Sequence, residues 1–481
     1  MAKTTNTNAV PRNQGETQTG INLMTKQILE NDKYFKHLKI YPYRSRKELR
    51  EWIKALSTNE YIDTIEIDLG NLIGRKSKRY AHILSILSSG RIKTVIFWVV
   101  GHRDAFLLDL ILRSNIENIE ELVIRRPVSG HPISFNVAQR GFQGLSSNTT
   151  IKLLDIGTNR ICDSTIRFIV ERLANNCTLR DFDVRFCGLE SASAASSIST
   201  LLRHNRSITG LRLQGNKFCH TGMQEILGSM HSNNAVKTLN LSRTNLGRCH
   251  AELRSMLKNN RTLEDLDLSQ NDLGRDGLRA LDVTTQNEKL KVLDLSSNRI
   301  GVTGSWYIGE MLVNYPNLEI LDLRNNAFNA GCLGTIACAI KDTHISELLL
   351  DYNEFGPDNI GYLRDLFKHR TLKKLSMSHC GFNSGVGSDQ NVIRSLANTG
   401  IERLDLTYND IGFDCIAPMM WALVPRFGDS MRCLRIFQGN YEFYTDTQLK
   451  SFVDCISRST ANGAQIAKAS GLPFYSEHYC V

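Results

Sequence analysis

Long apolar runs are missing from this 481-residue chain. A membrane-spanning helix needs about 20 consecutive, mostly apolar residues, whereas the longest suspicious stretch, IKTVIFWVV, covers only residues 92–100. The first twenty residues, MAKTTNTNAVPRNQGETQTG, contain no apolar segment of the kind that a secretory signal requires. We therefore expect neither a membrane span nor secretion.

Closely spaced cysteine pairs are also missing. The twelve cysteines are scattered singly, without any Cys-x-x-Cys motif, and this pattern does not favour a disulfide framework. A glycosylation sequon at Asn240 falls within an expected strand, where a glycan would break the sheet. Reduced, partly buried thiols are the better interpretation. We expect a cytoplasmic protein, with nuclear, cytoskeletal or ciliary locations as alternatives.

Catalytic signatures are absent as well. The chain has no GxxxxGK[ST] phosphate loop, no strand followed by GxGxxG, no HExxH and no GxSxG. Two dipeptides, Cys219-His220 and Cys249-His250, follow successive expected strands and could approach each other, as zinc ligands must. Loop residues that happen to recur are the simpler interpretation. We predict no enzyme, no cofactor and no bound metal.

What the chain does contain is one recurring nine-residue phrase, Leu-x-x-Leu-x-Leu-x-x-Asn. It appears most plainly as LEDLDLSQN, LKVLDLSSN and LEILDLRNN, at residues 263–271, 290–298 and 318–326. In the first of these, Leu266 and Leu268 alternate with Asp267, which predicts a short strand with one apolar face. The side chain of Asn271 can then satisfy backbone groups that a turn leaves open.

The phrase can be traced fifteen times, at steps of 27 to 32 residues. Its first positions are Phe35, Ile62, Ile92, Ile119, Ile151, Leu179, Ile208, Val236, Leu263, Leu290, Leu318, Ile345, Leu372, Ile401 and Met431. Between phrases, Gly-x-x-Gly and apolar residues at helical spacing predict a returning helix. Because strands stack ~4.8 Å apart and helices need ~8–10 Å, such an array must curve with its strands on the concave side.

These residues resemble the leucine-rich repeat in its ribonuclease-inhibitor-like form, with a repeat of about 28 residues. The resemblance implies an α/β fold: a curved, horseshoe-shaped solenoid of about 15 repeats, with a parallel sheet on the concave face and helices on the convex face. We expect four segments. They are a disordered polar tail (1–20), an N-terminal capping helix (21–34), the solenoid with degenerate early repeats (35–440), and a C-terminal cap and tail (441–481).

The resemblance also implies a function in binding. It is consistent with a non-enzymatic interaction scaffold or regulator that holds a protein partner in its concave groove. A regulator of a small GTPase is an alternative, because the Ran GTPase-activating protein carries similar repeats, although this chain has no strongly acidic segment after its repeats. A further alternative is binding of nucleic acid or another acidic partner at the N-terminal end. The oligomeric state is left open.

An acidic stripe is expected on the concave face. Strand alternation directs the fifth position of each phrase outward. This position supplies Asp155, Asp183, Asp267, Asp294, Asp322 and Asp405. The stripe fits either a consensus feature of the fold or selection for a basic partner, and it would repel the phosphates of nucleic acid in the groove.

Large side chains that interrupt this small and polar face are more informative. Tyr352, His379 and Tyr408 occupy the eighth position of three consecutive repeats, so they should form a row. Exposed aromatic residues with arginine and aspartate nearby are typical of protein-binding hot spots, although such side chains could merely cover the sheet near its end. We predict partner contacts at Arg185, Phe186, Arg212, Arg243, Asp351, Tyr352, His379, Tyr408 and Phe437.

The positive charge is concentrated near the N-terminus. Residues 1–126 hold 21 of the 58 basic and 14 of the 49 acidic residues, and thus +7 of the net charge of +9. A basic patch formed by Arg75, Lys76, Lys78 and Arg79 could mark a nuclear-import signal, an acidic partner or nucleic acid. A solvated loop and helix face is the alternative, and aromatic residues that could stack on bases are few there.

Overall fold

The computed structural model describes residues 28, 30, 33–34, 36–40, 46–68, 77–88, 91–99, 102–126, 132–281, 287–383, 385–411, 418–419, 422 and 433–435. The expected tail (1–20), the expected C-terminal segment (441–481) and most of the expected capping helix (21–34) lie outside these residues. The four-segment division therefore stays a proposal. The chain forms two compact units, Met1–Asp183 and Val184–Val481.

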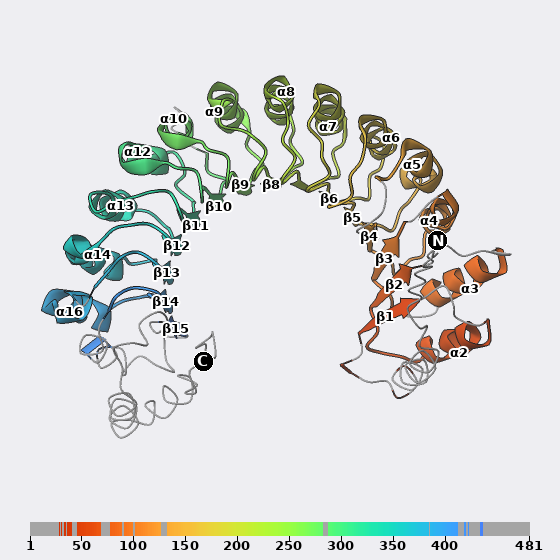
Figure 1. Ribbon diagram of the computed structural model, residues 1–481, viewed down its shortest axis with the longest axis horizontal. Helices are drawn as coiled ribbons and strands as arrows, with labels where there is room; N and C mark the ends of the chain where they lie inside the picture. The colour runs from red at the N-terminus through yellow and green to blue at the C-terminus, as the bar shows by residue number, and fades with distance from the viewer. Residues whose placement is uncertain are drawn as a thin grey trace, which may run out of the picture. The chain divides into compact units, whose positions relative to one another are not determined.

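The first unit alternates strands and helices. Its strands are β1 (His37–Ile40), β2 (Thr64–Asp68), β3 (Thr94–Trp98), β4 (Glu121–Arg125), β5 (Leu153–Asp155) and β6 (Asp181–Asp183). Its helices are α2 (Arg46–Leu56), α3 (Ser77–Ser88), α4 (His102–Ser114), α5 (Phe135–Gly141), the 3-10 helix η1 (Gln143–Ser146) and α6 (Asp163–Leu173). Each strand pairs in parallel with the next one along the chain. The strands lie along the inner side of an arc and the helices along its outer side (Figure 1).

The second unit repeats this arrangement with shorter strands. They are β7 (Gly210–Arg212), β8 (Thr238–Asn240), β9 (Asp265–Asp267), β10 (Val292–Asp294), β11 (Ile320–Asp322), β12 (Glu347–Leu349), β13 (Lys374–Ser376), β14 (Arg403–Asp405) and β15 (Cys433–Arg435). The α-helices are α7 (Ala192–His204), α8 (His220–Met230), α9 (His250–Asn259), α10 (Gly274–Leu281), α11 (Gly301–Ser305), α12 (Tyr307–Val313), α13 (Cys332–Ile340), α14 (Leu363–Phe367), α15 (Gly385–Ser388) and α16 (Gln390–Ala397), with the 3-10 helix η2 (Pro357–Tyr362) before α14. These strands also pair in parallel, in chain order.

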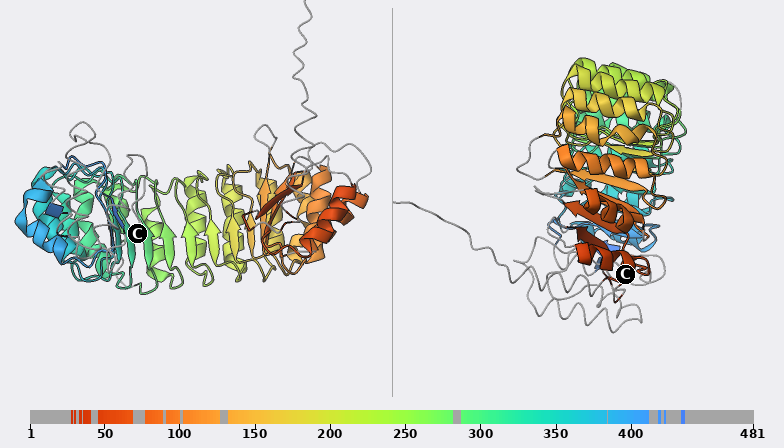
Figure 2. Two further views of the ribbon diagram at one scale, coloured as in Figure 1. Left: turned by 90° about the horizontal axis from the view of Figure 1, so that it is seen from below. Right: turned by 90° about the vertical axis from the view of Figure 1, so that its right-hand side faces the viewer.

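The recurring phrase accounts for this layering. Every described strand begins two residues after the first position of a phrase, as β9 does after Leu263. The first, fourth and sixth positions of that phrase, Leu263, Leu266 and Leu268, are fully buried between the sheet and the helices. Each unit is thus a curved α/β solenoid with a parallel inner sheet, which confirms the predicted fold class. Figure 2 shows the two layers of each unit from two further sides.

The asparagine that ends each phrase joins adjacent repeats. The side-chain amide of Asn298 donates to the carbonyl oxygens of Leu295 and of Leu268, one repeat earlier, at 3.0 Å each. Its Oδ1 accepts the backbone N–H of Asn271 at 2.9 Å. The two amide donations recur at Asn159, Asn216, Asn271, Asn326, Asn353 and Asn409. A buried amide that satisfies the open backbone groups of a turn stabilises the turn, and the predicted role of this asparagine is confirmed.

A second asparagine ladder lies where each helix returns to the sheet, and the sequence reasoning missed it. Asn260 accepts the N–H groups of Thr262 and Leu263 and donates to the carbonyl oxygens of Met230 and Asn233 in the preceding repeat. Asn59, Asn148, Asn176, Asn205, Asn233 and Asn287 occupy equivalent places. Both ends of a strand are therefore tied to the preceding repeat, and this fixes the spacing of the inner face.

Candidate functional site

The eighth position of the phrase has a left-handed backbone. In the second unit φ is 51° at Phe186, 71° at Gly215, 54° at Arg243, 57° at Gln270, 56° at Ser297, 51° at Asn325, 59° at Tyr352, 54° at His379 and 55° at Tyr408. Glycine and asparagine adopt this conformation readily, whereas bulky residues do so at a cost of roughly 1–2 kcal/mol. The turn enforces it at each of these positions of the second unit, whatever the side chain.

Hydrogen bonds to the next repeat explain this uniform backbone. The N–H of Tyr352 donates to the carbonyl oxygen of Ser378 at 2.9 Å, and the N–H of His379 donates to that of Thr407 at 3.1 Å. Gln270, in a repeat without a bulky residue here, makes the equivalent bond at 2.9 Å to Ser296. The eighth residues are therefore held in register along the edge of the concave face.

Three of these residues form a continuous aromatic stack, defined here as Tyr352, His379 and Tyr408. The ring centroids of Tyr352 and His379 lie 4.4 Å apart at 18°, and those of His379 and Tyr408 lie 4.1 Å apart at 22°. Tyr352 is 58% exposed and Tyr408 46% exposed. His379 is placed between them partly by a 2.9 Å contact from its Nδ1 to the hydroxyl of Ser378. The stack is thus rigid at its base and open to solvent.

Phe186 and Arg243 form a second group along the same row. A methyl group on Gly215 would lie 2.2 Å from the Phe186 ring, so this ring lies across the glycine. The Arg243 guanidinium lies 5.7 Å from the centroid of the same ring, within cation–π range. Because Gly215 has no side chain, Phe186 and Arg243 can contact each other although they lie two repeats apart.

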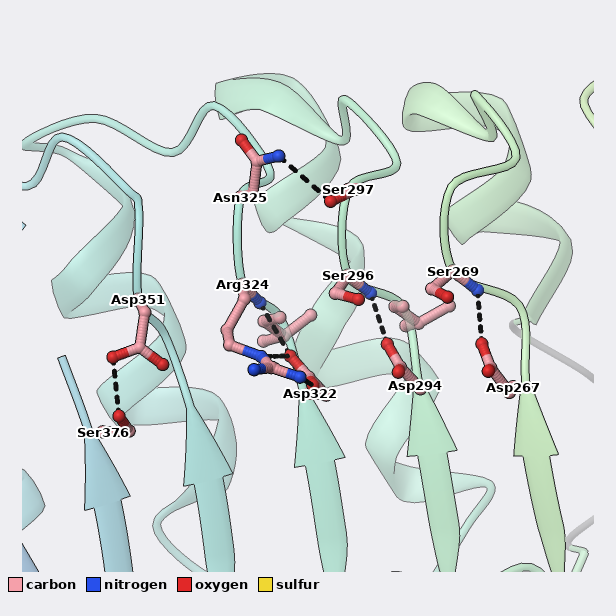
Figure 3. Close-up of polar contacts among 12 residues, drawn as sticks. Asp267, Ser269, Asp294, Ser296, Ser297, Asp322, Arg324, Asn325, Asp351 and Ser376 are labelled. Atoms are coloured by element: carbon pink, nitrogen blue, oxygen red, sulfur yellow. Dashed lines mark hydrogen bonds and ion pairs between the residues drawn. The ribbon is translucent and has the colours of Figure 1, made fainter. Parts of the chain in front are cut away.

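Fifth-position carboxylates end strands β9, β10, β11 and β14 of the second unit. Figure 3 shows Asp267, Asp294 and Asp322 side by side, and their Oδ1 atoms accept the N–H groups two residues later at 2.9, 2.8 and 3.0 Å. Asp405 does the same for Thr407, and in the first unit Asp155 does so for Gly157. The acidic stripe thus has a structural role in every one of these turns, whatever it binds.

The carboxylates differ in their electrostatic compensation. Arg324 folds back onto Asp322 with several short N–H···O contacts, and this pairing raises the pKa of Arg324. Asp267 accepts the side-chain amide of Asn240 at 2.6 Å. Asp294 contributes to this raised pKa of Arg324 and accepts hydrogen bonds from both the N–H and the hydroxyl of Ser296. Its burial, followed by the neighbouring Asp322 charge, raises its pKa to about 6.

Asp351 differs from the expectation that it projects beside Tyr352. It is buried, with 7% of its surface exposed. Its Oδ1 accepts the hydroxyl of Ser376 at 2.6 Å and the N–H of Ser378 at 2.7 Å, and burial raises the pKa of Asp351. The Asp351 side chain is thus drawn into the next turn. There it braces the backbone from which the His379 ring projects.

The other predicted contact residues are placed less decisively. Arg185 and Arg212 lie half-buried on the concave side of the second unit. Phe437, Arg75 and Lys76 lie outside the described residues, and of Lys78 and Arg79 only the backbone, in α3, is described. The side chains of Phe437 and of the four basic-patch residues therefore add no described contact to the site. The basic patch stays a prediction.

The two Cys-His dipeptides do approach each other. The Cys249 sulfur lies 3.3 Å from His220 Nδ1, and burial raises the pKa of the Cys249 thiol to about 11. Zinc requires thiolate and imidazole ligands, normally four of them in a structural site. Within the described part of the chain, no three histidine, cysteine, aspartate or glutamate side chains are grouped to hold a metal.

Comparison with known proteins agrees with this geometry. The family model described as "Leucine Rich repeat" matches residues 259–281 and 286–304. The chain carries leucine-rich repeats at these residues. Its ribonuclease-inhibitor-like class stays a prediction. Among the described residues, no helix has the length and apolar character that crossing a membrane requires.

Two curated relatives come from Mus musculus. The chain is 28% identical over 288 residues to "NACHT, LRR and PYD domains-containing protein 12", covering 58% of this chain and 24% of the relative. It is 31% identical over 102 residues to "NACHT, LRR and PYD domains-containing protein 9B", covering 21% and 10%. The chain thus spans about a quarter of the first relative's length. The solved structure of the yeast Rad7 and Elc1 complex matches with a TM-score of 0.37 and 12% identity, covering 64% of this chain and 84% of that one.

Proposed function

We propose that the second unit of this leucine-rich repeat protein is a non-enzymatic scaffold that binds a protein partner on its concave side, with the aromatic stack as the main contact. Tyr352 and Tyr408 are large, exposed and held in place by their neighbours. Rigid aromatic side chains lose little entropy on binding and dominate the energetics of many protein interfaces. Phe186 with Arg243 supplies a second anchor of the same chemical kind.

The left-handed backbone beneath the stack carries the proposal. A tyrosine with φ near 55° opposes folding relative to glycine or asparagine at the same place. The fold itself does not require an aromatic ring there, because Asn325 occupies the equivalent position one repeat earlier with φ of 51°. Three consecutive bulky rings in this conformation indicate a use for their exposed surface.

The alternatives receive no comparable support. The carboxylates at the ends of β9, β10 and β11 oppose the binding of phosphates in the groove. Leucine-rich repeats generally serve as binding scaffolds, and the exposed rings fit that use without further assumptions.

Affinity purification with mass spectrometry tests the proposal. The full chain would be compared with the double variant Tyr352→Asn/Tyr408→Asn, because asparagine suits the left-handed backbone and removes the rings. A matched control is Trp306→Asn, which removes an aromatic side chain that is 65% exposed between two helices of the outer layer.

Proteins that the native chain and the Trp306 variant retain, and that the double variant loses at an unchanged melting temperature, support the proposal. If the double variant retains every partner of the native chain, the stack is not the interface.

A further inference from the structure

The concave side of the second unit has an acidic centre between two basic flanks. Strands β9 to β12 carry Asp265, Asp267, Asp294, Asp322 and Glu347, of which Asp322 is buried and Glu347 pairs with Lys374 at 3.0 Å. The preceding repeats carry Arg185, Arg212 and Arg243, and the following strands carry Lys374 and Arg403. On a concave surface, charges of one sign focus the potential and attract groups of the opposite sign.

Asp294 lies in the middle of this acidic centre, at the end of β10. Asp322 is paired with Arg324, and Asp267 with the amide of Asn240. Asp294 accepts the Ser296 N–H at 2.8 Å and forms no ion pair within the described residues. Neighbouring strands are ~4.8 Å apart, so it lies between two other carboxylates in register with it. A cation placed there would relieve the repulsion among all three.

An apolar surface adjoins this carboxylate on the same strands. Val292 and Ile320 pair in register, two residues before Asp294 and Asp322, and both are half-exposed on the concave side. A ligand that suits this combination has an apolar stem and a cationic head. Arginine and lysine side chains have this construction, because their methylene stems pack on apolar surface while the charge stays at the polar end.

The aromatic stack begins close to this point. Tyr352 follows β12, two strands from β10, which corresponds to a lateral distance of ~10 Å. An extended segment covers that distance with about three residues at ~3.3 Å each. Guanidinium groups also stack favourably on tyrosine rings. One short segment can therefore reach both features.

We propose that the partner offers an arginine-bearing extended segment, with one guanidinium on Asp294, its stem on Val292 and Ile320, and a neighbouring residue on the Tyr352 end of the aromatic stack. This inference rests on the proposed function and names the chemistry of the partner. Metal ions are not the occupant, because no metal-holding group of three or more side chains occurs in the described residues. The phosphates of a nucleic acid would face the acidic centre directly.

Fluorescence anisotropy on the full chain tests this assignment. The probe is a labelled nine-residue peptide in which arginine, glycine and tyrosine recur three times. The matched peptide contains citrulline, a neutral isostere of arginine, in place of every arginine. We expect the arginine peptide to bind at least tenfold more tightly than the citrulline peptide, and the difference to shrink as salt rises from about 50 to about 500 mM, because salt screens charge pairs.

The variant Asp294→Asn should weaken binding of the arginine peptide at least tenfold and leave binding of the citrulline peptide unchanged. Asp272→Asn is the matched control, since it removes the same charge from a side chain that is 68% exposed and paired with Arg299 outside the acidic centre. Equal binding of the two peptides, or equal binding by the native chain and the Asp294 variant, would overturn the inference.

Capture of native partners separates this inference from the proposed function. If the Tyr352/Tyr408 double variant loses partners that the Asp294 variant keeps, the aromatic stack is the interface and the arginine assignment is wrong. If both variants keep every partner, both ideas are wrong. Loss of the same partners with both variants, when neither variant is less stable than the native chain, supports both ideas.

Discussion

Asp294→Asn should make the protein more stable at neutral pH, although it removes a hydrogen-bonded carboxylate. The side chain lies at the end of β10, half-buried between Asp267 and Asp322, and it accepts the N–H of Ser296 at 2.8 Å and the hydroxyl of the same residue. Burial is the main cause that raises its pKa from 3.8 to about 6, and the charge of Asp322 adds to it. Ionised Asp294 therefore opposes folding.

The magnitude follows from the two pKa values. Each pH unit between them corresponds to about 1.4 kcal/mol, so the ionised group costs roughly 3 kcal/mol above pH 7. Asparagine keeps an acceptor for the Ser296 N–H, as Asn240 does for Ser242 at 2.9 Å. The weaker neutral hydrogen bond gives back about 1 kcal/mol. We expect a net gain of about 1–2 kcal/mol in the free energy of unfolding.

The difference in the free energy of unfolding between the variant and the native chain should depend on pH. The folded state holds the Asp294 proton more tightly than the unfolded chain, so this group favours folding increasingly as the pH falls from about 7 to about 4. The variant lacks that contribution. Its advantage over the native chain should be largest above pH 7 and should be lost as the pH falls toward and below 3.8, because the carboxyl then becomes protonated in both states.

Urea unfolding followed by circular dichroism between pH 4 and pH 8 measures this difference, at about 1.4 kcal/mol per pH unit where the slope is greatest. Asp272→Asn serves as the control for general charge effects, because Asp272 is exposed and paired with Arg299. A stability difference that stays constant with pH, or a variant less stable than the native chain at pH 7.5, would refute the electrostatic reasoning.

Three further outcomes test the fold and the eighth position. Asn298→Ala should lower the free energy of unfolding by about 2–4 kcal/mol in urea titration, because it leaves two carbonyl oxygens and one N–H of adjacent repeats unsatisfied. Gly215→Ala should destabilise by about 1–3 kcal/mol and displace the Phe186 ring, which differential scanning calorimetry and ring NMR shifts would show. Tyr408→Asn should change the free energy of unfolding by less than about 1 kcal/mol, because the loss of ring stacking and the relief of backbone strain offset each other. A large loss there would mean that the ring serves stability rather than binding.

Much of the inner face could be predicted from periodicity because period-two alternation follows directly from strand geometry. The row of Tyr352, His379 and Tyr408 is an example. Their place in the phrase put them on adjacent turns, and the structure shows their rings stacked. Periodicity could not show that Asp351, one residue earlier, is turned into the next repeat, because that depends on the hydroxyl of Ser376 and the N–H of Ser378.

The contacts between repeats needed the three-dimensional arrangement. The second asparagine ladder was visible in principle as an Asn three residues before most phrases, as at Asn260, but its partners lie one repeat away. Phe186 and Arg243 are 57 residues apart in the chain. They meet only because Gly215, between them, has no side chain.

The sequence by itself determined the repeat, its period, the buried leucines and the faces of the strands, because these follow from local geometry that recurs every 27 to 32 residues. Only the tertiary structure decided which eighth-position side chains carry backbone strain and which carboxylates are compensated. Both properties depend on hydrogen bonds and charges supplied by the neighbouring repeat, at distances that no pattern within one repeat records.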